Sequence, residues 1–90
     1  MNASLFKIKI MPTSPEVNLE AIKKSAEKII KKEKGKNIEF EEEPIAFGLN
    51  AVIVSFEISE EQEMNSIENS LEEIEEVSSV RVVDMRRAFG

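Results

Sequence analysis

Residues 41–49 have the sequence EEEPIAFGL, which matches neither a simple helix nor a simple strand pattern. Pro44 lacks a backbone N–H and favours extended geometry at the residue before it, so a strand should end there. Gly48 permits a positive φ angle immediately before a run rich in β-branched residues. These two breakers, with strand-like sequence on either side, predict a shaped hairpin connection.

Two large apolar residues, Ile45 and Phe47, lie inside this connection, where polar turn residues are usual. Apolar side chains of this size need a cover. The simpler expectation is that both fold back beneath the sheet as a small satellite core. The alternative is that they contact a partner protein.

The segments on either side of the connection have strand patterns. Residues 38–43 alternate Ile38 and Phe40 with glutamates, which indicates a strand with one solvated face. Residues 49–58 are apolar at nearly every position, which is typical of an interior strand. Residues 5–11 also alternate, and Pro12 should end that half-buried strand.

Two apolar stripes have helical spacing. The first is formed by Leu19, Ile22, Ala26, Ile29 and Ile30, opposite a lysine-rich face. Ser14 or Asn18 can cap this helix, and Gly35 should end it. The second stripe is formed by Met64, Ile67, Leu71 and Ile74, beside an acidic face that we expect to be solvated. A β-branched run over residues 79–85 predicts a final strand.

The order strand, helix, strand, strand, helix, strand predicts an α+β fold. Two right-handed crossovers joined by a hairpin give the ferredoxin-like βαββαβ sandwich, with a four-stranded antiparallel sheet and both helices on one face. The first and third strands should be central. Because lysines alternate along the first strand, the other face of the sheet should be open to solvent.

Composition restricts both organisation and chemistry. Ninety residues suit one domain, residues 1–90, and there is no apolar run long enough to cross a membrane. The start of the chain lacks a signal-peptide pattern, so we expect it in the cytoplasm. We also expect the chain alone to be a monomer. The absence of cysteine and histidine removes the usual zinc ligands, thiol nucleophile and imidazole base. We therefore expect no cofactor, no metal and no enzymatic activity.

Charge is distributed unevenly along the chain. Residues 1–37 contain nine lysines and four glutamates, a net charge of +5, whereas residues 38–90 contain three arginines and fourteen acids, a net charge of −11. Such an asymmetry can steer a charged partner. The overall charge of −6 argues against nucleic acid as that partner.

The string EEEPIAFGLNA at residues 41–51 resembles the signature of the elongation factor 1-beta family. The resemblance covers nearly the whole chain, from IKIMP at residues 8–12 to VRVVD at residues 80–84, and PIAFG is its specific part. A free-standing chain of this length is similar to the archaeal members. The family exchanges guanine nucleotide on elongation factor 1-alpha during translation elongation. The resemblance therefore implies an exchange factor that promotes GDP release.

The resemblance also implies a contact surface. Family members are understood to disturb the Mg²⁺ and phosphate region of elongation factor 1-alpha with the carboxyl-terminal end of the domain, while the PIAFG connection shapes the contact. Carried onto this chain, the partner-binding residues are Pro44, Ile45, Ala46, Phe47, Gly48, Asp84, Arg86, Arg87 and Phe89.

This chain departs from the family pattern at its end. Eukaryotic members have a lysine near the terminus that is assigned the Mg²⁺-displacing role, and residues 84–90 contain no lysine. Arg86 or Arg87 could supply the cation. The alternative is that both arginines pair with glutamates of the acidic helix or of residues 41–43.

Other function classes fit the sequence less well. An RNA-binding module of this topology would expose aromatics on its central strands among basic residues, whereas Phe6 and Phe56 have the parity of core residues. A small-molecule-binding regulatory domain of ferredoxin-like topology remains the alternative, and ligand-dependent melting without a partner protein would identify it.

Overall fold

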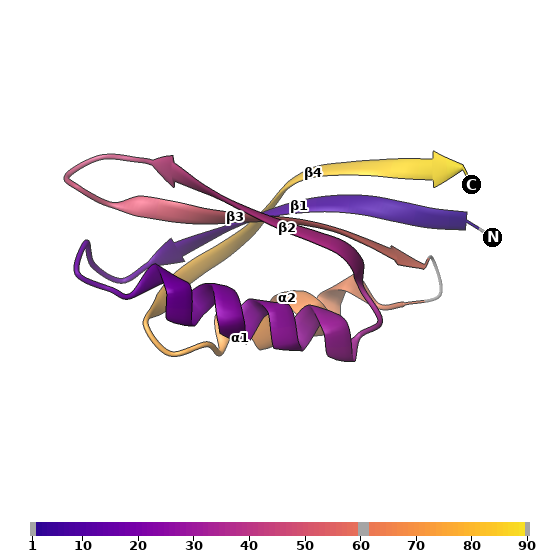
Figure 1. The fold of residues 1–90 in the computed structure, drawn as a ribbon, viewed down its shortest axis with the longest axis horizontal. Helices are drawn as coiled ribbons and strands as arrows, with labels where there is room; N and C mark the ends of the chain where they lie inside the picture. The colour runs from indigo at the N-terminus through magenta and orange to yellow at the C-terminus, as the bar shows by residue number, and fades with distance from the viewer. Residues whose placement is uncertain (1, 60–61, 90) are drawn as a thin grey trace.

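A computed structural model describes residues 2–59 and 62–89. The elements follow the predicted βαββαβ order (Figure 1). They are β1 (Asn2–Pro12), α1 (Leu19–Lys32), β2 (Lys36–Pro44), β3 (Asn50–Ser59), α2 (Met64–Glu72) and β4 (Val77–Phe89).

The four strands form one antiparallel sheet in the order β2-β3-β1-β4, so β1 and β3 are central as predicted. Both helices lie on the same side of the sheet, and no other element of the described residues covers its second face (Figure 1). The ferredoxin-like α+β fold is therefore confirmed. The strands are long and the molecule is elongated, with extents of 42 × 20 × 18 Å.

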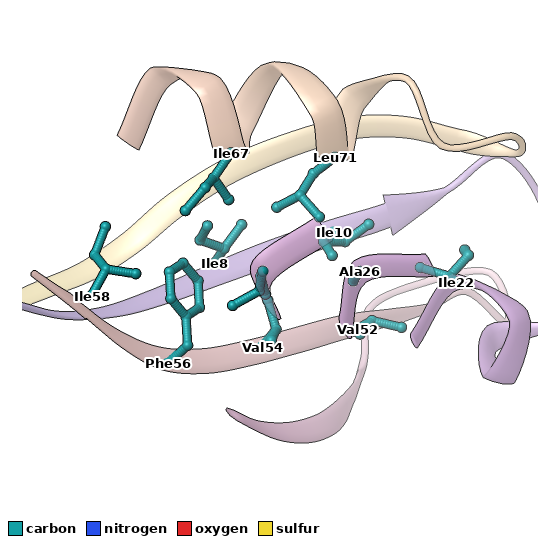
Figure 2. Close-up of a cluster of buried hydrophobic side chains, with 11 residues drawn as sticks. Ile8, Ile10, Ile22, Ala26, Val52, Val54, Phe56, Ile58, Ile67 and Leu71 are labelled. Carbon is teal, nitrogen blue, oxygen red and sulfur yellow. The ribbon is translucent and has the colours of Figure 1, made fainter. Parts of the chain in front are cut away.

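The core lies between the sheet and the helices (Figure 2). Even-numbered residues of the central strands point into it, as the period of two requires. Ile8 on β1 and Val54 on β3 are paired in register and are both fully buried. The rings of Phe6 and Phe56 stack with their centroids 6.0 Å apart. Both aromatics therefore belong to the helix side of the sheet, as their parity predicted.

Helix α1 begins at Leu19 with Asn18 as its N-cap, which resolves the choice between two possible caps. The Asn18 side-chain oxygen accepts hydrogen bonds from the backbone N–H groups of Glu20 and Ala21, at 3.0 and 3.4 Å. These bonds satisfy donors that have no partner within the helix. Ser14 instead accepts from the backbone N–H of Glu16 in the preceding turn.

The end of α1 differs in detail from the expectation. The helix ends at Lys32, and the left-handed residue that follows is Lys34, with φ 66°, rather than Gly35. Gly35 donates its N–H to the Ile30 carbonyl oxygen at 2.8 Å. A Cβ atom on Gly35 would clash with the Ile30 side chain. Glycine is needed here because the chain passes close to a buried isoleucine.

Helix α2 ends at Glu72, so Ile74 packs from the following turn rather than from the helix. The glutamates at positions 72, 73, 75 and 76 are exposed and Glu68 is half-buried. The predicted acidic face is therefore largely solvated, but positions 73, 75 and 76 lie after the end of α2. Among the described residues, no helix is long and apolar enough to cross a membrane.

Candidate functional site

The hairpin between β2 and β3 is closed by two backbone hydrogen bonds. Ile45 donates its N–H to the Leu49 carbonyl oxygen at 2.8 Å, and Leu49 donates to the Ala46 carbonyl oxygen at 3.0 Å. The two central residues of the inner turn, Phe47 and Gly48, have φ angles of 57° and 80°. Positive φ at both positions is the type I′ pattern, which suits the twist of paired strands and favours Asn-Gly.

The satellite-core expectation for Phe47 is wrong. Its side chain is 95% exposed at the tip of the hairpin, because the type I′ turn points it away from the sheet. A left-handed conformation costs a non-glycine residue about 1–2 kcal/mol. The free domain therefore gains neither burial nor favourable backbone geometry from this phenylalanine. This combination favours a contact role for Phe47.

Ile45 is 39% exposed and leans over the open face of the sheet rather than into the core. It lines a concavity of about 330 Å³ together with Lys9, Met11 and Arg81. On the other side of the hairpin, Gly48 approaches the ring of Pro15 in the loop after β1. The hairpin thus rests against the end of the sandwich, and its outer surface remains free.

Alternating glutamates of β2 tie the strand to its neighbours on both faces. On the open face, Lys9 Nζ of β1 lies 2.9 Å from Glu43 Oε1, crossing over β3. On the helix face, Lys23 Nζ of α1 lies 2.8 Å from Glu42 Oε2 and 3.0 Å from Glu20 Oε2. The hydrogen bond with Glu42, followed by that with Glu20, raises the pKa of Lys23 above 10.5. These contacts hold the base of the hairpin in place.

The other candidate segment lies on β4. Arg86 Nε is 3.2 Å from Asp84 Oδ2, and both side chains are on the open face, 76% and 43% exposed. They line a shallow concavity of about 490 Å³ with residues of the other three strands, including Leu5, Glu39 and Glu57. The alternative in which Arg86 pairs with glutamates of the acidic helix or of residues 41–43 is therefore wrong for this side chain, since its ion pair is with Asp84.

The two adjacent arginines do not form one cluster. Arg86 is paired in register with Leu5, and Arg87 with Ser4, so the two side chains lie on opposite faces of the sheet. Arg87 lines a separate concavity of about 330 Å³ with Phe6 and Met85 on the helix side. The backbone of Phe89 lies in β4, and its side chain is outside the described part of the structure.

A β-bulge in β4 determines which arginines lie on the open face of the sheet. Ile8 pairs with Val82 but Lys7 pairs with Asp84, so Val83 is an extra residue in β4. An extra residue reverses the parity of everything beyond it. Before the bulge the odd-numbered Arg81 lies on the open face, and after it the even-numbered Arg86 does.

The two candidate segments lie far apart along the molecule. The hairpin is at one end of the long axis, and the final residues of β4 are at the other (Figure 1). Asp84 is level with Ser55, five residues along β3 from the hairpin base at Asn50, or about 17 Å at 3.3–3.4 Å per residue. The open face of the sheet connects them.

Sequence reasoning missed the residues in between. Lys9, Met11 and Arg81 occupy the open face beside the hairpin. The alternation along β1 was the signal that could have found the first two. The described residues contain no group of three or more His, Cys, Asp or Glu side chains that could hold a metal ion. The exposed ring of Phe47 suits contact with a protein surface.

Comparison with known proteins supports this interpretation. Residues 5–88 match the model of the EF-1 guanine nucleotide exchange domain. The chain is 44% identical over 89 residues to "Elongation factor 1-beta" of Methanocaldococcus jannaschii, covering 98% of this chain and 100% of that protein. It is 44% identical over 82 residues to the protein of the same name from Methanothermobacter thermautotrophicus, covering 89% and 90% of the two chains. A relative from Methanococcus maripaludis is 38% identical over 86 residues.

Proposed function

Since this chain belongs to the EF-1 guanine nucleotide exchange domain family, we propose that it promotes the release of GDP from elongation factor 1-alpha and so allows GTP to replace it. We further propose that residues 1–90 act as a single exchange domain. The observation that carries the proposal, beside the family, is the exposed Phe47 on a left-handed backbone, which the free domain does not need. Such residues occur where a contact requires them.

Exchange of this kind needs no bond to be made or broken in the exchange factor. A guanine nucleotide is held largely by its phosphates and a bridging Mg²⁺. A protein that binds the nucleotide-free state more tightly than the loaded state lowers nucleotide affinity by the same factor. A coupling free energy of about 4 kcal/mol corresponds to about a thousandfold.

The contact surface that we propose has two parts. Residues 44–48 form the hairpin contact, with Phe47 as its anchor and Pro44, Ile45, Ala46 and Gly48 setting its shape. Residues Asp84, Arg86, Arg87 and Phe89 form the part at the carboxyl-terminal end of β4. Within that part, Arg86 is the arginine on the open face of the sheet, the face that also carries the concavity beside Ile45. We therefore assign Arg86 to the Mg²⁺ and phosphate region.

The proposal is tested by measuring the release of fluorescent GDP from purified elongation factor 1-alpha after addition of excess unlabelled GDP. We expect the release rate to rise with the concentration of this chain and then to saturate. A release rate that is independent of the added chain would exclude the proposed function.

Reciprocity provides an independent measurement. If the chain weakens GDP binding, GDP must weaken binding of the chain by the same factor. Titration of labelled chain with elongation factor 1-alpha should therefore give a much tighter complex without nucleotide than with saturating Mg²⁺ and GDP. Equal affinities in the two states would contradict an exchange role even if a complex forms.

A further inference from the structure

Arg81 is an exposed cation on the open face whose charge is not used within the domain. Its side chain has no hydrogen bond or ion pair with any residue in the described ranges 2–59 and 62–89. Its direct neighbour across β1 and β4 is Lys9, another cation on the same face. Like charges placed directly opposite each other in a sheet are destabilising. The Arg81 charge therefore does not stabilise the free domain.

The surrounding charges do not compensate Arg81. Lys9 is already paired with Glu43 at 2.9 Å, and Asp84, the acid nearest in sequence, is paired with Arg86 at 3.2 Å. The concavity of about 330 Å³ that Arg81 lines has apolar walls from Met11 and Ile45. A groove with one uncompensated cation beside apolar side chains suits an acidic side chain flanked by an apolar one.

We infer that this groove, formed by Lys9, Met11, Ile45, Ser79, Val80 and Arg81, docks an acidic segment of elongation factor 1-alpha, with a partner carboxylate on Arg81. The inference rests on the proposed function. Its occupant follows from two observations, the unpaired positive charge and the continuity of the groove with the hairpin. Ile45 belongs to both the groove and the hairpin, so a protein that binds Phe47 also extends over Arg81.

The test compares two charge reversals with the same change in formal charge. Arg81→Glu alters the groove, and Lys28→Glu alters the exposed surface of α1 on the opposite side of the sheet. Because Arg81→Glu replaces a like-charged neighbour of Lys9 by an opposite charge, its melting temperature should not fall. Arg81→Gln, which only removes the charge, serves as a second variant for the same measurement.

The measurement is the acceleration of fluorescent GDP release from elongation factor 1-alpha at low and high salt. At about 0.05 M salt we expect Arg81→Glu to lower the second-order rate of exchange roughly tenfold, Arg81→Gln to lower it less, and Lys28→Glu to leave it nearly unchanged. At about 0.5 M salt the difference should shrink, because charge interactions at a rim are screened.

Two outcomes would overturn the inference while leaving the proposed function intact. One is a wild-type rate and salt dependence in both Arg81 variants. The other is an equal loss in Arg81→Glu and Lys28→Glu, which would report net charge rather than the groove. If the wild-type chain itself does not accelerate GDP release, the proposed function fails, and the inference fails with it.

Discussion

Phe47 combines two features that a folded domain normally avoids, a positive φ angle at a non-glycine residue and a nearly fully exposed aromatic ring. Neither feature stabilises the domain. Phe56, by contrast, is 2% exposed and stacks on Phe6 in the core. The same residue type is therefore exposed at position 47 and buried at position 56. Variants of Phe47 and Phe56 can distinguish a contact role from a packing role.

For Phe47→Ala we expect a change in the free energy of unfolding of less than about 1 kcal/mol, because almost no burial is lost. Binding to elongation factor 1-alpha should weaken by about 2 kcal/mol or more, the scale of an interface hot spot. The control Phe56→Ala should lower stability by about 3–5 kcal/mol. Chemical denaturation and affinity measurements on both variants check this. Normal binding by Phe47→Ala would remove the hairpin anchor from the contact surface.

The terminal arginines should differ from each other because they lie on opposite faces of β4. We expect Arg86→Ala to slow GDP release at low salt and Arg87→Ala to have a smaller effect. Melting should be nearly unchanged for Arg86→Ala, since an exposed ion pair such as that with Asp84 contributes at most about 1 kcal/mol. Equal losses in the two single variants would contradict this assignment.

At the scale of elements, β2 is an edge strand held from both sides by its glutamates. Lys23 links it to α1 through Glu42, and this interaction raises the pKa of Lys23. A raised lysine pKa stabilises the fold at pH values below the unfolded pKa of about 10.5. The contribution is lost as the pH rises through the folded value.

Replacement of Lys23 by Met should therefore lower stability by about 1 kcal/mol at neutral pH. The difference from wild type should stay constant up to a pH near 10.5 and shrink above it, because the wild-type lysine then loses its proton. Urea denaturation at several pH values checks this, with Lys24→Met as the control on the same helix. A difference that stays constant through the alkaline range would show that the charge is unimportant.

The junction between α1 and β2 gives a second prediction at this scale. Gly35→Ala should destabilise the domain by about 1–3 kcal/mol, because the new methyl group would clash with the buried Ile30. Lys34→Gly should stabilise it by up to about 1 kcal/mol, because Lys34 has a positive φ angle. Denaturation midpoints of the two variants check both signs. A stabilising Gly35→Ala would show that the Ile30 side chain can move aside.

Much of the arrangement of strands and helices was predictable from the sequence. The periods of two and 3.6 gave the strands and helices, and the apolar character of residues 51–56 placed β3 inside the sheet. The direction of Phe47 could not be predicted, because it depends on which residues of the connection adopt positive φ. The face of the sheet on which Arg86 lies could not be predicted either, because it depends on the bulge at Val83. A regular strand and a bulged strand can have the same run of β-branched residues.

That Arg86 and Arg87 lie on opposite faces of the sheet, however, could have been predicted from the sequence. Neighbouring residues of a strand point to opposite faces, so two adjacent arginines there cannot form one cluster. Arg86 and Arg87 are therefore not interchangeable as the source of the cation near the terminus.

At the scale of the whole molecule, the hairpin and the end of β4 lie toward opposite ends of a 42 Å long axis. A standard protein interface buries about 800 Å² on each partner, which is enough to extend over much of one face of this sheet. A single partner can thus contact Phe47 with one part of its surface and reach Arg86 with another. The rigid sheet would fix the spacing between the two contacts.

The central claim is that this chain acts as an exchange factor, and turnover tests it most directly. Elongation factor 1-alpha loaded with fluorescent GDP is mixed with excess unlabelled GTP and an amount of this chain far below that of the elongation factor. If the chain leaves each complex once GTP has bound, all of the labelled GDP is released at a rate proportional to the small amount added. Release that stops at the amount of added chain, or that proceeds at the spontaneous rate, would contradict the claim.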